Sequence, residues 1–380
     1  HGGKGRHNIS STRMGDASGV KKSTHFVGTK QERLEKSKQE EEYKIEDLKK
    51  TITRLHKQID KMRNRYDDLE LAVKNAVKDA IADIEIPKIT PPKKDKRKKG
   101  EEVAVAVLSD WQLGKITASY NSEIAAGRVA EFAEKVVELT NIQRASHPVK
   151  KIHIWALGDI IEGTDIFAGQ QWLVDSGLYI QIFKNGATMM ADFLRVMLAN
   201  FEEVHFAGVI GNHGRLGRFG QHHYEDNGDR FLYETVRLIL ADEKRITWDI
   251  PEGRDGDRAW YTVDRIGNYS CMLIHGDQIR GSLGIPFYGV RKKVLGWKAA
   301  AMDGQMPDFK DVAFGHWHQL YQQEFNGITV RCSGSTESSN HYALENLAAQ
   351  GRPTQRLMFV HPEKGWTTVE YPAVRLGTKE

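Results

Sequence analysis

Seven polar residues of the types that bind metal ions each lie just after a short apolar segment. They are two aspartates, three histidines, an asparagine and a glutamine: Asp110, Gln112, Asp159, Asn212, His275, His316 and His318. Carboxylate, imidazole and carboxamide groups together suit two divalent cations of borderline-to-hard character. The set contains no thiolate, which argues against a structural zinc cage. The sequence therefore predicts a site for two divalent cations.

The apolar segments have the length of buried strands and alternate with longer helical patterns. Strands are expected at 103–108, 152–157, 204–210, 271–274, 312–314 and 328–332, and helices around 123–145, 178–200, 229–242 and 288–301. Strands separated by helices indicate an α/β fold. Ligands bind beyond the carboxyl ends of strands in open α/β sheets, so the polar residues after the first five strands should converge on one crevice.

Five motifs follow one another along the chain: D-x-Q at 110–112, GD-x-x-x-G at 158–163, GNH at 211–213, a histidine at 275 and GH-x-H at 315–318. In this order they resemble the motifs of the calcineurin-like metallophosphoesterase superfamily, over about residues 103–340. The resemblance is to the repair-nuclease and phage-encoded branch. It implies a four-layer α/β/β/α sandwich that hydrolyses phosphate esters directly at a two-metal site.

The resemblance also implies a role for each residue. The ligands of one metal would be Asp110, Gln112, Asp159 and His318. Asp159 would bridge to a second metal, which Asn212, His275 and His316 would also bind. His213 would bind no metal but would stabilise charge on the phosphate or protonate the leaving oxygen. Manganese is the expected cation, and magnesium, iron and zinc are the alternatives.

Two positions depart from the family pattern. Gln112 stands where the family usually has histidine, and its neutral, harder oxygen should favour manganese or magnesium over zinc. Gly214 stands where the family usually has an acidic residue that orients the neighbouring histidine. Asp165 or Glu162 could take over this role toward His213.

Several residues near the motifs admit two interpretations. Arg215 could contact a phosphate oxygen or be an ordinary surface arginine. Trp111 and Trp317 could stack on a base or pack beneath the metals. The polar residues of 222–226 could form a further metal site or a solvated loop. The insertion at 164–177 is expected to shape substrate access.

The segment 32–86 carries the pattern of a coiled coil. Apolar residues follow an unbroken 3-4 spacing: Ile45, Leu48, Ile52, Leu55, Ile59, Met62, Tyr66, Leu69, Val73 and Ala76. This repeat predicts a left-handed coiled coil, and the alternation of Ile or Val with Leu or Met favours a parallel dimer. The alternative is one amphipathic helix that packs on the globular domain.

Basic residues dominate the remaining parts before the globular domain at 102–380. Residues 1–31 are expected to form a disordered basic arm. The linker at 87–101 contains six cations in seven residues: Lys93, Lys94, Lys96, Arg97, Lys98 and Lys99. This cluster could tether nucleic acid or merely separate two parts of the chain. Arg291, Lys292 and Lys293 could follow a nucleic-acid backbone or form a solvated helix face.

The charge of the 380 residues is unevenly distributed. Residues 1–102 hold 26 Lys and Arg against 18 Asp and Glu, whereas the remaining residues hold 29 against 33. The sequence has two cysteines, no apolar run long enough to span a bilayer and no secretory signal. These features indicate a cytoplasmic protein, in the host cytoplasm if phage-encoded.

The expected function is a two-metal phosphodiesterase, a DNA nuclease. The alternatives are a phosphomonoesterase or small-molecule phosphodiesterase, and a non-catalytic DNA-binding scaffold.

Overall fold

A computed structural model describes most of the chain after residue 42: residues 43–57, 71, 75, 88–253, 259–281, 286–339, 344–345 and 351–378. The chain divides into two units, His1–Leu71 and Ala72–Glu380. In the first unit, residues 43–57 form a helix whose Ile45 and Leu48 are exposed. Most of the expected coiled coil at 32–86 and all of the basic arm at 1–31 lie outside the described residues. The coiled coil and its dimer therefore stay predictions.

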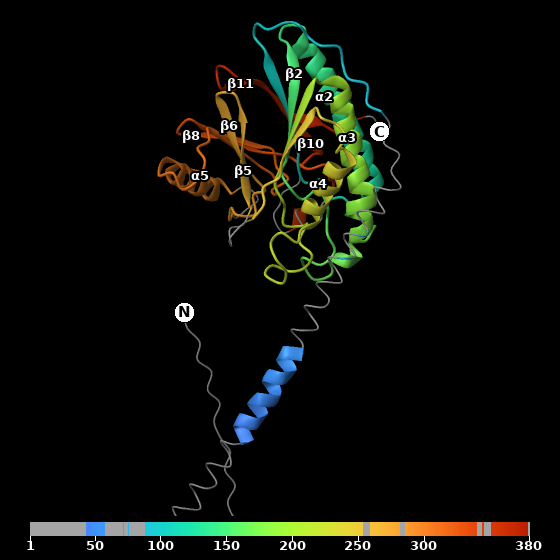
Figure 1. The fold of residues 1–380 in the computed structure, drawn as a ribbon, viewed down its shortest axis with the longest axis vertical. Helices are drawn as coiled ribbons and strands as arrows, with labels where there is room; N and C mark the ends of the chain where they lie inside the picture. The colour runs from blue at the N-terminus through green and yellow to red at the C-terminus, as the bar shows by residue number, and fades with distance from the viewer. Residues whose placement is uncertain are drawn as a thin grey trace, which may run out of the picture. The chain divides into compact units, whose positions relative to one another are not determined.

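The second unit contains two mixed β-sheets (Figure 1). The first sheet has the order β11-β10-β1-β2-β3-β4, and its strands are β1 (Glu102–Leu108), β2 (Val149–Ala156), β3 (Glu203–Gly208), β4 (Ile246–Asp249), β10 (Thr354–His361) and β11 (Trp366–Arg375). Strands β1 to β4 are parallel, and β10 and β11 are antiparallel to their neighbours.

The second sheet has the order β5-β6-β7-β9-β8. Its strands are β5 (Tyr261–Ile266), β6 (Tyr269–Ile274), β7 (Asp311–Phe314), β8 (Tyr321–Phe325) and β9 (Ile328–Cys332). The three central strands β6, β7 and β9 are parallel, and the edge strands β5 and β8 are antiparallel. Motif-bearing strands in both sheets are therefore parallel to their motif-bearing neighbours.

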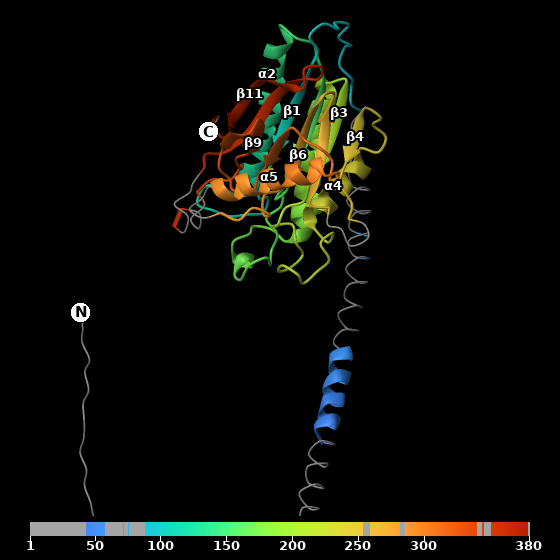
Figure 2. The same cartoon turned by 90° about the vertical axis from the view of Figure 1, so that its left-hand side faces the viewer.

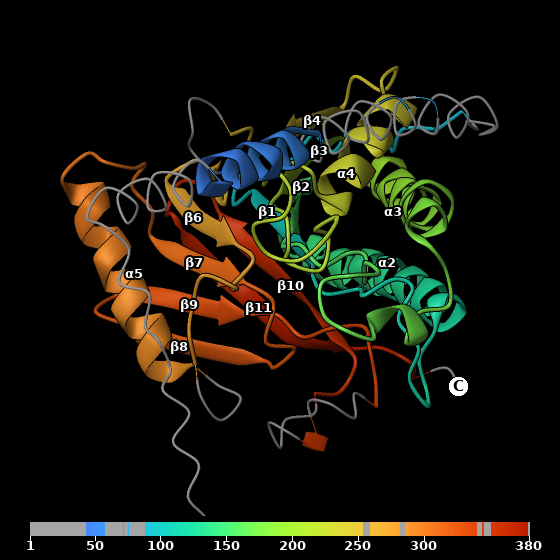
Figure 3. The same cartoon turned by 90° about the horizontal axis from the view of Figure 1, so that it is seen from below.

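Helices cover the outer face of each sheet (Figures 2 and 3). The first sheet is covered by α2 (Ser122–Arg144), α3 (Ala187–Asn200) and α4 (Gly228–Ile239), and the second by α5 (Phe287–Met302). A π-helical segment, η2 (Ile180–Gly186), leads into α3, and a short 3-10 turn, η1 (Gln170–Trp172), precedes it. Asn121 and Asn227 cap α2 and α4, since each side chain accepts a hydrogen bond from a backbone N–H of the first turn.

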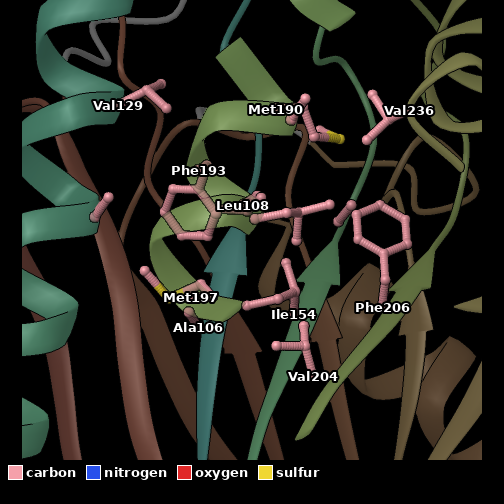
Figure 4. Close-up of a cluster of buried hydrophobic side chains, with 14 of the residues drawn as sticks. Ala106, Leu108, Val129, Ile154, Met190, Phe193, Met197, Val204, Phe206 and Val236 are labelled. Carbon is pink, nitrogen blue, oxygen red and sulfur yellow. The ribbon is translucent and has the colours of Figure 1, made fainter. Parts of the chain in front are cut away.

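Side chains that alternate between the two faces of the strands form three apolar layers. In β1, Ala106 and Leu108 face the helices with Ile154 and Phe206 of the neighbouring strands, where they meet Phe193 of α3 (Figure 4). The intervening valines, including Val105, face the second sheet. A third cluster lies between the second sheet and α5. The predicted α/β/β/α layering of the globular part is thus present.

Residues 88–100 lie along the globular domain. Ile89 packs against its core, and the backbone N–H of Asp95 donates to Glu202 Oε1 at 2.8 Å. Arg97 pairs with Asp95 at 2.7 Å and donates to the carbonyl of Arg144. The basic residues of this segment are exposed, but the segment itself is held by the domain and is not a free tether. Among the described residues, no helix has the length and apolar character to cross a bilayer.

Candidate metal centre

Three parallel strands of the first sheet and two of the second deliver the seven predicted ligands to one place. The loops after β1, β2, β3, β6 and β7 carry them, and backbone bonds join these loops directly. The N–H of Asp110 donates to the carbonyl of Gly158 at 3.1 Å, and that of Gln112 to the carbonyl of Asp159 at 3.0 Å. We call the seven residues Asp110, Gln112, Asp159, Asn212, His275, His316 and His318 the candidate metal centre.

His275 lies at the middle of one half of this centre. Its Nε2 is 3.0 Å from Asp159 Oδ2, 3.0 Å from Asn212 Oδ1 and 3.2 Å from His316 Nδ1. Its Nδ1 is 2.7 Å from the carbonyl of Leu157, to which it can only donate. Nε2 therefore points at the other ligand atoms, the orientation that a metal-binding imidazole requires. Burial opposes protonation of this ring, but Asp159 and Asp110 outweigh it and raise the pKa of His275 to about 10, so Nε2 carries a proton whose place a bound cation would take.

The other half shares Asp159 with the first. Gln112 Nε2 lies 3.4 Å from Asp159 Oδ2, and His318 Nε2 lies 3.3 Å from Asp110 Oδ1. The backbone N–H of His316 donates to Asp110 at 3.0 Å and joins the two halves. All seven predicted ligands thus form one connected group with Asp159 between its halves.

The backbone of this group is strained. Among the described residues, non-glycine residues with a positive φ are few, and five of them belong to the centre: Asp110 (51°), Gln112 (50°), Asp159 (50°), His316 (68°) and His318 (53°). Each such conformation costs about 1–3 kcal/mol and typically persists where function requires it. The strain is concentrated on the residues that the sequence selects as ligands.

The charges also fit bound cations. Asp110 and Asp159 are completely or almost completely buried, and such carboxylates need compensating positive charge. Burial opposes the charge of Asp159, but His275 and His213 outweigh it and hold the pKa of Asp159 well below its usual value. Burial, together with the charge of His275, lowers the pKa of His316 to about 3. At neutral pH His316 is therefore neutral, the form that binds metal.

His213 lies beside the ligands without joining them. Its Nδ1 is 3.2 Å from Glu162 Oε2, and its backbone N–H donates to Asp159 Oδ1 at 2.7 Å. Burial opposes protonation, but the charges of Glu162 and Asp159 outweigh it and raise the pKa of His213. Of the two acidic residues that could orient His213, the structure places Glu162 in this role, while Asp165 is exposed.

The glycine after the GNH motif has a packing reason. A Cβ atom at Gly214 would lie 2.2 Å from Asn227 Oδ1. Asn227 both caps α4 and donates to the carbonyl of Gly211 at 2.8 Å. An acidic side chain at position 214 would displace this asparagine, so the carboxylate that orients His213 comes from Glu162 instead.

Three residues that the sequence did not single out support the centre. Glu337 Oε1 lies 3.4 Å from His318 Nδ1, and Lys115 pairs with Glu337 at 2.6 Å. Lys115 Nζ is also 3.3 Å from Gln112 Oε1. Asp229 accepts backbone N–H groups from residues 159–161 and from Gly211, and thereby clamps two motif loops.

The carboxylate of Glu337 should strengthen metal binding. Glu337→Gln removes the charge that His318 faces, and supporting residues of this type typically contribute about 10–100-fold to metal affinity. We expect Mn²⁺ affinity, measured by titration calorimetry, to fall by that amount. Glu324→Gln, an exposed residue of β8, is the matched control. Equal affinities of wild type and Glu337→Gln would show that Glu337 has no supporting role.

The remaining candidates lie apart from the metal ligands. Arg215 Nη2 is held by Asp277 Oδ2 at 2.9 Å, so this arginine is paired within the protein. Trp111 is fully buried and Trp317 packs partly buried on a core cluster, which excludes base stacking by Trp111 and favours packing for both. Arg291, Lys292 and Lys293 are exposed on α5. The described residues contain two metal-type ligand groups, and neither includes 222–226.

No protein-family model matches this chain, and no curated protein matches it. Solved structures give low similarities. A hypothetical protein from Pyrococcus horikoshii is 11% identical with a TM-score of 0.35, over 73% of this chain and 90% of that one. A novel archaeal phosphodiesterase is 13% identical with a TM-score of 0.32, over 70% and 98%. Vps29 from Entamoeba histolytica complexed with zinc is 14% identical with a TM-score of 0.29, over 67% and 84%. These TM-scores are too low to define the fold.

Proposed function

We propose that this protein is a two-metal-dependent phosphoesterase of the calcineurin-like type that cleaves phosphodiester bonds in DNA. The observation that carries the proposal is the connected group of seven ligand side chains, five of them in strained conformations, with an oriented histidine at its side. Such a group has no evident structural purpose, because buried carboxylates and strained backbone both destabilise a fold.

The donor set indicates which residues would hold each cation. Asp110, Gln112 and His318 would serve one ion, and Asn212, His275 and His316 the other, with Asp159 shared. Hard oxygen donors favour Mn²⁺. Gln112 would supply its oxygen only after its amide group turns, because Nε2 faces Asp159 and Oε1 lies 3.3 Å from Lys115 Nζ. When bound, the two cations supply Lewis-acid polarisation of the phosphate and activation of a water molecule.

His213 has the position of a catalytic acid. Glu162 occupies its Nδ1, which leaves Nε2 as the nitrogen that can donate a proton to the leaving oxygen. Its raised pKa favours the protonated ring, which can also stabilise negative charge on the phosphate. Arg215 is held by Asp277, so a phosphate contact by Arg215 would require exchange of that partner.

Two exposed aromatic residues support a nucleic-acid substrate. Trp172 and Phe219 are 80% and 69% exposed, in the loops that follow the GD-x-x-x-G and GNH motifs. Exposed aromatic rings in loops that follow ligand motifs are suited to stacking on bases. Trp172 is the stronger candidate, because the Arg215 guanidinium lies over the Phe219 ring at 5.1 Å from its centroid. Basic residues at 93–99 and 291–293 are exposed and could bind backbone phosphates, and a dimer through 32–86 would present two sites to one duplex.

Hydrolysis of DNA and of a small phosphodiester, measured side by side, tests this proposal. Wild-type protein with Mn²⁺ should cleave labelled single- or double-stranded DNA and also bis-nitrophenyl phosphate. Trp172→Ala should weaken DNA binding by about 1–3 kcal/mol, the usual contribution of base stacking, and leave the small ester unaffected. Trp366→Ala, 56% exposed on β11, is the matched control.

Three outcomes separate the candidate functions. Cleavage of the small diester without cleavage of any DNA or RNA would contradict the nuclease and indicate a small phosphodiester substrate. Faster turnover of nitrophenyl phosphate than of its bis-ester would indicate a phosphomonoesterase. Binding of DNA without hydrolysis of any ester would indicate a scaffold.

A further inference from the structure

A second group of metal-type ligands lies between the two sheets, away from the candidate metal centre. His153 on β2 and His205 on β3 are register partners in parallel strands, so their side chains lie on the same face. This is the face on which Trp155 and Ala207 meet the second sheet. Asp264 on β5 lies on the same face of its strand as Ile266, which also belongs to the layer between the sheets. One residue from each of three strands thus meets at this point.

The three side chains contact one another closely. Asp264 Oδ2 is 2.7 Å from His153 Nδ1, and Asp264 Oδ1 is 3.5 Å from His205 Nε2. The two imidazole rings are 4.7 Å apart between centroids. Trp155 Nε1 donates to Asp264 Oδ2 at 2.6 Å. The ligand atoms that the three residues offer all lie within 4.8 Å of one another.

The position of the group makes its charge costly. The side chain of Asp264 is only 3% exposed and lies beside apolar residues of the layer between the sheets, including Trp155 and Ile266. A charged carboxylate at such a place destabilises the fold unless positive charge or strong donors surround it. A bound cation would supply that charge.

His205 is oriented as a metal ligand is. Its Nδ1 lies 2.8 Å from Thr247 Oγ1, which can accept a hydrogen bond from it. Nε2 then carries the lone pair and faces Asp264 and His153.

Space for an ion and its remaining ligand is present. The group lines a cavity of about 490 Å³, together with Lys151, Thr247 and other residues of β2 to β5. Three protein ligands beside an open position are the usual arrangement of zinc sites that also bind water. The cavity is separate from the candidate metal centre. His153 lies four residues before Leu157, whose carbonyl accepts a hydrogen bond from His275, and four residues of extended chain span about 13 Å.

We propose that His153, His205 and Asp264 bind one divalent transition-metal ion of the zinc type. The ion would tie β2 and β3 of the first sheet to β5 of the second, and its open position would face the cavity. This site is independent of the proposed phosphoesterase activity, since it shares no ligand with the candidate metal centre.

Zinc stoichiometry of the full chain tests the proposal. Wild-type protein freed of metal should bind one Zn²⁺ equivalent more than His205→Ala in calorimetric titration, and Mn²⁺-dependent hydrolysis should be the same in both. Lys244→Ala, exposed at the rim of the same cavity, is the matched control and should keep the full stoichiometry. Equal stoichiometry of wild type and His205→Ala would overturn the proposal.

A variant that lacks the candidate metal centre allows zinc binding at the second site to be measured alone. The double variant Asp159→Asn, His275→Ala should still bind one Zn²⁺ equivalent and should melt at a higher temperature with zinc than without it. Adding His205→Ala should abolish both effects, whereas adding Lys244→Ala should not. Loss of zinc binding in the double variant itself, with its fold retained by circular dichroism, would also overturn the proposal.

Discussion

Replacing Asp159 with asparagine is expected to reduce phosphoester hydrolysis by about 10³-fold or more, because the shared ligand of both cations is lost. Two-metal sites supply several kcal/mol of transition-state stabilisation, and each 1.36 kcal/mol is a factor of ten in rate. Asp159 touches Gln112 on one side and His275 on the other, so no neighbouring side chain can replace it. The measurement is kcat for bis-nitrophenyl phosphate with saturating Mn²⁺.

The matched control is Asp165→Asn, which changes an exposed aspartate six residues further along the chain. It should leave both kcat and metal content unchanged. Asparagine keeps the size of the buried side chain at 159, and circular dichroism would confirm that the fold is intact. Wild-type turnover by a folded Asp159→Asn protein would exclude the proposed role of Asp159.

Replacing His213 with alanine is expected to separate catalysis from metal binding. A positioned acid contributes about 10²–10⁴-fold to the rate, so kcat should fall within that range while Mn²⁺ stoichiometry is unchanged. Glu162→Gln should have a smaller effect in the same direction, because it weakens the orientation of His213 without removing the ring. His222→Ala, an exposed histidine in the same loop, is the control.

The metal measurement decides how His213 acts. If His213→Ala lost a Mn²⁺ equivalent together with its activity, His213 would be a ligand and not an acid. If its kcat matched that of the wild type, the leaving oxygen would take its proton from another group. Either result would require a different assignment of the residues around Glu162.

The candidate centre was predictable because its residues obey a local rule. Asp110, Asp159 and His275 each follow a buried parallel strand, and such strands end at a common edge of their sheet. The same rule applied to the sixth predicted strand, 328–332, would have found Glu337, which lies five residues beyond β9. Glu162 was already among the candidates for orienting His213.

Other features depend on tertiary contacts that leave no local pattern. Strand β10 was not predicted although it lies beside β1 and its apolar run, 357–360, is as long as the predicted strand at 271–274. Its first half contains the buried polar residues Gln355 and Arg356, which bond to Ser109 and to the carbonyls of Cys332 and Tyr321, contacts that the sequence does not reveal.

Asp229 is a further case of this kind. Asp229 follows Asn227 and Gly228, a position typical of an ordinary acidic residue in the first turn of a helix. In the fold it is completely buried, and burial together with the charge of Asp159 raises its pKa to about 6. Only the approach of the 159–161 and 211 loops reveals its role, and no spacing along the chain encodes that approach.

The central claim, a two-metal centre around Asp159, is tested most directly by anomalous diffraction from crystals grown with Mn²⁺. We predict two anomalous peaks about 3.5–4 Å apart, the usual separation in two-metal sites, with the Asp159 carboxylate between them. One peak should lie beside Gln112 and His318, and the other beside Asn212 and His275. Saturating Mn²⁺ with no peak at Asp159, or with a single peak there, would contradict the claim.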